Sequence, residues 1–562
     1  MTWDLVLRGG RVVDGTGRPP FTADVAVKDG RIRCVGRVDG AARRTLDVAG
    51  ALVTPGFIDV HTHYDAQLDW DPTASPASWH GVTTVLCGNC GFTLAPVRQE
   101  DTAWLAQMLS RVEGMAGPAL AAGLRWTGGS FGEFWQRVEG RLGVNAGGYV
   151  GHSAVRRWVM GDAASERRAT DAEVAAMQAL VRSAMREGAL GFSTSQLDIH
   201  VAHDGRGVPS NCASTDEIVA LASVLAEFGH GAIEIIPRTF VDGMDTTDRE
   251  LLLACYRASR RPIEIQTLTP LLPGCPDGWE RSLAFAHEAW KSGAHIHPMV
   301  ATNRLGAHLT LGSTFLFDEL PSFRDALTLP RGERERRLRD ATVRAQMRRE
   351  LADPTGRAFV FVWDVVRVEA VRDAAHAAWV GRSVPELAAE RSQEALDCFL
   401  DVSLAEDLET QFVLEMPPSD YFRECTARLV RDPIVMAGSS DGGAHLLSFT
   451  GADYPTRLVA EWVPDVLSLE EAVQKLTSVP AAVHGVRDRG VLREGAWADV
   501  LVIDPARLRA GATRLVKDFP GGSGRFVVDA EGYVATIVNG EVLLDAGCWT
   551  GALPGHVVRG GT

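Results

Sequence analysis

The chain has 562 residues, 46% of them hydrophobic and 23% charged, which is typical of a globular protein too long for one simple core. Its 57 basic and 72 acidic residues give a formal net charge of -15, which disfavours nucleic acid and anionic membranes as partners because both need a basic surface. No apolar run approaches the ~20 residues that span a bilayer, and Asp4 stands where a signal peptide needs a basic region. We therefore expect a cytoplasmic protein.

The two ends of the chain both read as short strands joined by tight turns. Segments 4–15, 24–32 and 46–53, and again 498–504 and 533–544, are apolar stretches punctuated by Asp-Gly or Asn-Gly turns. Such flanking strands have edges that must be covered. We predict a small β-sandwich built from residues 1–54 and 486–546, followed by an irregular tail over 547–562.

Between these ends, short apolar strands alternate with helices. The eight predicted strands are 57–60, 82–87, 148–151, 190–193, 232–236, 263–267, 294–300 and 434–440. Three helices are predicted to open with capping boxes at 170–173, 214–217 and 468–471. This α/β alternation predicts a TIM (β/α)8 barrel over residues 55–485, with its active site at the carboxyl ends of the strands.

One connection is far longer than the others. About residues 301–433 separate the seventh and eighth predicted strands and include helical stretches at 331–349 and 384–400. An insertion of this size usually covers an active site or makes an oligomer contact. We leave open which of the two applies, and with it whether the protein is a homo-oligomer.

The first predicted barrel strand ends in a pair of histidines. His61 and His63 lie two residues apart, so on an extended strand both side chains leave from the same face and can share one cation. Pro55-Gly56 breaks any preceding helix, and Phe57 favours a buried strand. The alternative is a hydrogen-bonded core histidine beside a surface histidine.

Two further strand ends carry groups that bind metals. Cys90 follows the second strand, and Asp441 follows the eighth inside a glycine-rich turn, where it is placed to bind metal, to act as general base, or both. The nine cysteines are odd in number and scattered, which does not indicate a disulfide framework. Cys87 and Cys90 have the C-x-x-C spacing of redox and zinc-ribbon sites, but no second pair exists, so we interpret Cys90 as a single thiolate near the histidines.

Four other residues are candidates for binding the substrate. His445 lies four residues beyond Asp441, His297 belongs to the seventh strand, and His152 follows the third. Arg238 follows the fifth strand and could pair with a substrate carboxylate. Each of these residues could instead have a structural role, as a packed core histidine, as a residue that fixes a loop, or as a surface residue.

With these residues in hand, the chain resembles the amidohydrolase superfamily and, more narrowly, the D-aminoacylase (N-acyl-D-amino-acid deacylase) family. The resemblance spans nearly the whole length, and its motifs are at 55–63, 80–91, 151–153, 188–194, 440–441, 476–481 and 488–499. It implies a TIM barrel with a β-sandwich from both termini. It also implies zinc held by His61, His63, Cys90 and Asp441, with Asp441 as general base and acid in the hydrolysis of an N-acyl-D-amino acid, a small-molecule substrate.

The chain departs from this family at two strands. The family carries one zinc-binding histidine after the fifth strand and another after the sixth, whereas Ile236 and Thr267 occupy those positions here. We therefore expect one zinc ion rather than two, with Glu234, Glu264 or His297 as additional candidates. A hydrolase of cyclic amides, a non-hydrolytic enzyme and a metal-free binding protein on the same fold remain alternatives.

Overall fold

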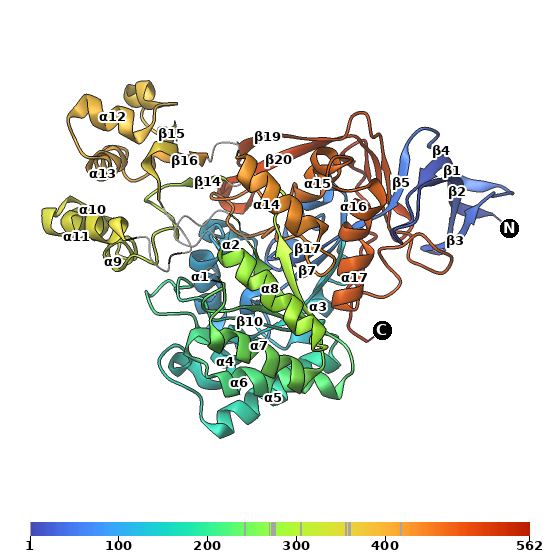
Figure 1. Cartoon of the computed structure of the whole chain (residues 1–562), viewed down its shortest axis with the longest axis horizontal. Coiled ribbons are helices and arrows are strands. Elements are labelled where there is room, and N and C mark those ends of the chain that lie inside the picture. Colours follow the sequence, from blue (N-terminus) through green and yellow to red (C-terminus); the bar gives the residue numbers. More distant parts are fainter. Residues whose placement is uncertain are drawn as a thin grey trace.

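The computed structural model of this chain describes residues 2–240, 243–268, 270, 277–303, 306–353, 357, 361–415 and 419–561. A barrel of parallel strands lies at its centre, with the terminal strands at one end and the inserted segment at the other (Figure 1). Within those residues, no helix is both long enough and apolar enough to cross a membrane.

The barrel is built as predicted, from eight strand positions that follow one another in the chain. Its strands are β6 (Phe57–Thr62), β7 (Val82–Cys87), β8 (Asn145–Gly148) with its continuation β9 (Val150–Gly151), β10 (Gly191–Ser195), β11 (Ala232–Ile236), β12 (Ile263–Thr267), β13 (Ile296–Val300) and β17 (Met436–Ala437). All neighbours pair in parallel, in the orders β6-β7-β8 and β9-β10-β11-β12-β13-β17. The backbone after β17 closes the ring, because Thr62 bridges Gly442 and His63 N donates to the Gly442 carbonyl at 2.7 Å.

Alternation along each strand separates an apolar outer face from a polar inner face. In β11, Ile233 and Ile235 pack in the main core with residues of the surrounding helices, including Leu221 and Leu252. Glu234, between the two isoleucines, faces the inside instead. This period of two places ionisable side chains in the barrel while the helices bury the apolar ones.

Helices surround the barrel (Figure 1). They are α1 (Thr102–Val112), α2 (Gly117–Gly123), α3 (Phe131–Val138), α4 (His152–Met160), α5 (Asp171–Arg186), α6 (Thr215–Ser223), α7 (Thr246–Ser259), α8 (Gly278–Lys291), α14 (Asp420–Arg431), α15 (Tyr454–Trp462), α16 (Leu469–Leu476) and α17 (Ser478–His484).

Two of the three predicted capping boxes are present, at Thr170/Glu173 and Ser468/Glu471. The third is only half formed: Ser214 accepts from the Glu217 amide, but the Glu217 carboxylate turns inward to Arg156.

Both termini join in one continuous nine-stranded sheet. Its order is β23-β22-β21-β18-β5-β1-β2-β3, with β4 paired to β1, so strands from the two ends meet where β5 pairs antiparallel with β18. The strands are β1 (Trp3–Val12), β2 (Phe21–Lys28), β3 (Arg31–Gly36), β4 (Ala42–Asp47), β5 (Leu52–Pro55), β18 (Val500–Ile503), β21 (Tyr533–Val538), β22 (Glu541–Asp545) and β23 (Cys548–Trp549). Side chains from both ends share one core, which includes Leu7, Val25 and Val500.

A hairpin leaves this terminal unit and reaches the barrel. It consists of β19 (Arg509–Val516) and β20 (Arg525–Glu531). His80 Nε2 donates to the Val528 carbonyl at 2.9 Å, and Phe526 N donates to the Leu446 carbonyl at 2.8 Å. The hairpin therefore forms a wall beside the loop that follows β17.

The inserted segment has a sheet and a hydrophobic core of its own, and lies to the left in Figure 1. Its sheet has the order β14-β16-β15, and its helices pack on that core. The elements are β14 (Gly306–Leu309), α9 (Pro321–Leu327), α10 (Arg331–Arg339), α11 (Ala341–Ala352), β15 (Val366–Ala370), α12 (Val384–Arg391), α13 (Ala395–Ala405) and β16 (Gln411–Glu415). Each predicted helical stretch is thus two helices, the first divided at Asp340, which caps α11.

The predicted irregular tail begins with the short strand β23 and is irregular only beyond it, yet it is firmly attached. Val557 bridges Ala146 in parallel, Val558 N donates to the Ala146 carbonyl at 2.8 Å, and Gly560 N donates to the Gly188 carbonyl at 3.0 Å. The tail therefore crosses the amino ends of β8 and β10.

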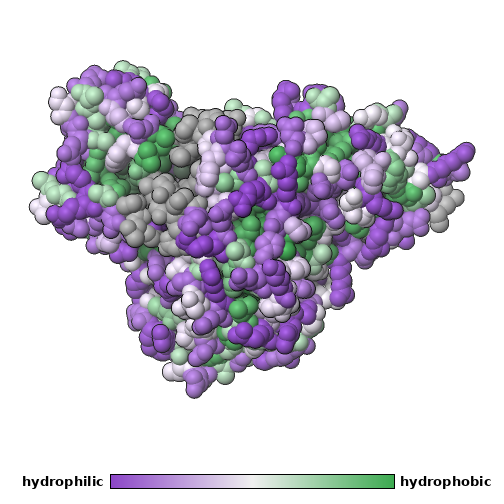
Figure 2. Space-filling view, viewed as in Figure 1, coloured by the Kyte–Doolittle hydropathy of each residue, from purple (hydrophilic) through white to green (hydrophobic). Residues whose placement is uncertain are grey.

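The face of the molecule in Figure 2 is mostly hydrophilic, with apolar side chains in smaller groups between polar ones.

The packing of the start of β10 against β11 can be tested by substituting two glycines. Gly191 has φ +147, and a Cβ there would overlap the Ala232 carbonyl of the neighbouring strand, whereas Gly293 has φ +86 and open space around it. Gly293→Ala should cost only the backbone penalty of about 1–2 kcal/mol. Gly191→Ala adds a backbone clash and should cost more than about 3 kcal/mol.

The measurement is thermal unfolding by circular dichroism, with soluble yield alongside. Equal melting temperatures of the two variants would contradict this packing of β10 against β11.

Candidate metal centre

The end of β6 places two imidazoles inside the barrel mouth. His61 is fully buried and His63 is 1% exposed, with ring centroids 5.8 Å apart. His61 Nε2 lies 3.5 Å from Cys90 Sγ, and one donor atom from each of His61, His63 and Cys90 lies within 4.8 Å of the other two. Among the residues that the structure describes, no other three His, Cys, Asp or Glu side chains converge in this way.

Cys90 is held in place by the turn after β7. Its own φ is +57, and the preceding Asn89 donates through its side-chain nitrogen to the carbonyls of Thr62 and Leu86, each at 3.1 Å. Cys90 N donates to Glu234 Oε2 at 2.6 Å. Cys87 and Cys90 are both free thiols, so they do not form a disulfide with each other.

Asp441 approaches the histidines from the loop after β17. Its Oδ1 lies 3.2 Å from His61 Nε2 and 3.8 Å from His63 Nε2. Burial opposes ionisation of this carboxyl, but the hydrogen bond from His61 and the neighbouring imidazoles hold its pKa well below the usual range. Asp441 is therefore an anion facing two histidines.

Glu264 lies behind His61. Its Oε1 is 3.2 Å from His61 Nδ1, and its Oε2 is 3.3 Å from Nε2 of His484, whose Nδ1 is hydrogen-bonded to the Tyr149 hydroxyl. Burial lowers the pKa of His61, but the neighbouring Cys90 sulfur and the hydrogen bonds to Asp441, Cys90 and Glu264 raise it well above the usual range. Nε2 of this ring faces Cys90 and Asp441, two groups that are themselves electron donors.

Glu113, which follows α1, is a member of the site that the sequence did not reveal. It is 2% exposed, and its Oε2 lies 3.5 Å from His63 Nε2 and 3.6 Å from His445 Nε2. Burial raises the pKa values of Glu113, Glu234 and Glu264. Burial therefore drives these carboxyl groups toward the neutral form unless a positive charge lies beside them.

The arrangement fits a divalent cation. Zinc bonds of ~2.0–2.1 Å to nitrogen or oxygen and ~2.3 Å to sulfur imply separations of roughly 3.3–3.6 Å between tetrahedral ligands. The contacts of His61 Nε2 with Asp441 and Cys90, at 3.2 and 3.5 Å, lie close to that range. Burial lowers the pKa of His63 to about 3, so the ring is neutral, and neither of its nitrogens has a hydrogen-bond partner among the described residues.

The fifth and sixth strands supply no imidazole to this site. Ile236 is a buried apolar side chain at the end of β11, and Thr267 ends β12. The inward-facing groups of these strands are the carboxylates of Glu234 and Glu264 instead.

Two of the four predicted substrate-binding residues, His445 and Arg238, lie in different places. His445 lies in the site, 3.6 Å from Glu113 and tilted against the ring of Phe315. Arg238 lies past β11, where its half-exposed side chain pairs with Asp198.

Two of these predictions need correction. His152 is fully buried, and both of its ring nitrogens are engaged, with Thr194 Oγ1 at 2.8 Å and Glu217 Oε1 at 2.9 Å, so it ties α4 to its neighbours. His297 is the second residue of β13, in the amino half of the strand, where its Nδ1 donates to the Ile434 carbonyl at 3.2 Å. Neither ring faces the mouth.

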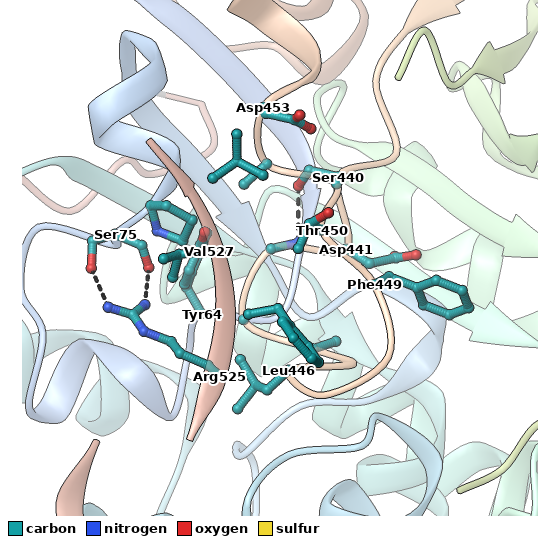
Figure 3. A pocket seen from close by; sticks show the side chains of 18 of the residues that line it. Tyr64, Ser75, Ser440, Asp441, Leu446, Phe449, Thr450, Asp453, Arg525 and Val527 are labelled. Atoms are coloured by element: carbon teal, nitrogen blue, oxygen red, sulfur yellow. Dashed lines mark hydrogen bonds between the residues drawn. The ribbon is translucent and has the colours of Figure 1, made fainter. Parts of the chain in front are cut away.

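A pocket opens beside Asp441 (Figure 3). The loop with Ser440, Asp441 and Phe449 forms one wall, and Arg525 and Val527 of β20 lie on the other. The Asp441 side chain is 26% exposed, whereas His61, His63 and Cys90 are buried. Asp441 is therefore the member of this group that lines the pocket.

Comparisons with known proteins agree with this geometry. The model of the amidohydrolase family matches residues 44–544. The chain belongs to the amidohydrolase family. It is 30% identical to an uncharacterised protein of Mycobacterium tuberculosis, covering 98% of this chain and 93% of that protein.

Two relatives of known activity also align over the full length. The D-aminoacylase of Alcaligenes xylosoxydans xylosoxydans is 28% identical and covers 99% of this amidohydrolase and 97% of its own length. The structure of N-acyl-D-glutamate deacylase from Bordetella bronchiseptica, complexed with zinc and a phosphonate inhibitor, is 25% identical, covers both chains completely and superposes with a TM-score of 0.69.

The structural role of His152 can be tested through its partner. Arg156 donates from Nη1 to both oxygens of Glu217 at 2.5 Å, and all three side chains are buried. Glu217→Gln leaves a buried guanidinium without its anion and should destabilise the protein by about 3–5 kcal/mol at neutral pH. Although burial raises the pKa of Glu217, its bonds to His152 and Arg156 lower it overall, so this difference should shrink as pH falls below about 4.

Thermal unfolding and metal content of the purified variant are the measurements. Loss of metal with an unchanged melting temperature would show that His152 and Glu217 serve the centre rather than the fold.

Proposed function

We propose that this protein is a metal-dependent hydrolase that cleaves the linear amide bond of an N-acyl-D-amino acid or a related N-acyl compound. One observation carries the proposal: His61 is fixed by Glu264 at Nδ1 while its Nε2 faces Cys90 Sγ and Asp441 Oδ1. Family membership and the deacylase activities named for its relatives support the choice of an amide substrate.

The proposed ligands of the cation are His61, His63, Cys90 and Asp441, with one zinc ion as the expected occupant. When bound there, zinc polarises a carbonyl oxygen and lowers the pKa of water toward neutrality. Glu264 orients His61, and the cation would lie among buried side chains, with Asp441 as the partly exposed member of the set.

Asp441 is the proposed general base and acid. Its pKa lies below the usual range, so the carboxylate is ionised at neutral pH, and the oxygen that does not face His61 is the proposed acceptor of a proton from water. The same carboxyl then returns the proton to the leaving amine nitrogen, which would otherwise depart as an unstable anion. Its partial exposure allows both transfers to occur at the pocket.

Asp441→Asn tests this role. The amide is isosteric and still offers an oxygen to His61, but it cannot accept the proton, so turnover should fall at least about 100-fold. The assay is amine release from paired N-acyl-D- and N-acyl-L-amino acids, with Glu133→Gln, which changes a capping carboxylate of α3, as the control for general damage.

Full activity of Asp441→Asn would refute the role. Amine release only from cyclic amides, and none from the acyl amino acids, would refute the substrate class.

A further inference from the structure

Glu113 is tied to the site through its backbone. It caps the end of α1, and its carbonyl accepts from His445 N at 2.5 Å. Gly114, with φ +56, follows it, and a Cβ there would come within 3.2 Å of His445 Cα. The end of α1 and the loop after β17 are therefore held backbone to backbone, which aims the Glu113 side chain at the histidines.

The distance between the Glu113 carboxylate and His63 is typical of two ligands that bind the same cation. Its Oε2 is 3.5 Å from His63 Nε2, and His63 is 1% exposed, with no hydrogen-bond partner at either ring nitrogen among the residues that the structure describes. A buried imidazole with two unpartnered nitrogens, facing a buried carboxylate at this separation, indicates a cation between them.

Glu113 and Glu264 differ in which nitrogen of the histidine ring they face. His63 Nε2 faces both Glu113 and Asp441, at 3.5 and 3.8 Å, so Glu113 lies on the ligand side of that ring. Glu264 instead contacts His61 Nδ1, the nitrogen opposite the one that faces Cys90 and Asp441. Glu264 is thus placed to orient a ligand, and Glu113 is placed to be one.

We propose that Glu113 is itself a ligand of the divalent cation, supplied by α1 rather than by a barrel strand, and that it replaces a donor missing at Ile236 and Thr267. The inference rests on the proposed function, because it assumes a cation at His61 and His63. Two carboxylates, two imidazoles and one thiolate form a mixed donor set that accommodates Co²⁺ as well as Zn²⁺.

The experiment loads metal-free protein with Co²⁺, whose visible absorption reports its ligand number. Glu113→Gln should lower Co²⁺ affinity at least about tenfold and change the position and intensity of the visible bands, because one ligand is lost. Glu264→Gln is the matched control: it should weaken binding while leaving the bands of the bound ion in place, because the ligand set is unchanged. Glu113→His, which restores a donor atom, should recover binding with a shifted spectrum.

Circular dichroism of the metal-free forms establishes that each variant is folded, and Glu113→His carries the test if Glu113→Gln does not fold. A Glu113→Gln or Glu113→His variant that binds Co²⁺ with the wild-type affinity and spectrum would overturn the inference and leave the proposed function standing. Wild-type protein that binds no Co²⁺ or Zn²⁺ would overturn both.

Discussion

The structure depends on His61, a buried imidazole held between electron donors at both of its ring nitrogens. Glu264 occupies the Nδ1 side, and Cys90 and Asp441 occupy the Nε2 side. Such an arrangement is stable only if positive charge resides at its centre, either on the ring itself or on a bound cation. His63 lies next to it as a neutral ring without a hydrogen-bond partner in the described part of the chain, which favours the cation.

The fold brings these donors together at the barrel mouth. Four separate segments meet at the barrel mouth: the end of β6, the turn after β7, the loop after β17 and the end of α1. Asn89 and the Thr62–Gly442 bridge fix the first three segments to one another, so the contacts that close the barrel also position these donor side chains. The hairpin β19–β20 then leaves Asp441 as the accessible member of the set.

The sequence predicts that side chains at the carboxyl ends of the buried strands lie together, and in the structure they do. His61, His63, Cys90 and Asp441 all follow that rule, and the parallel barrel brings such ends together. The rule failed for His152 and His297: the first begins a helix and turns toward Glu217, and the second lies too early in its strand. Glu113 carries no local signal, because only the packing of α1 against the loop of His445 places it there.

The central claim is that the histidine pair holds a cation despite the absence of imidazoles on β11 and β12. The most direct test is the metal content of purified protein by plasma mass spectrometry, with the His61→Ala/His63→Ala variant beside the wild type. The account predicts about one zinc ion per wild-type chain and none in the folded variant. Well-folded wild-type protein that retains no metal after zinc is supplied would contradict it.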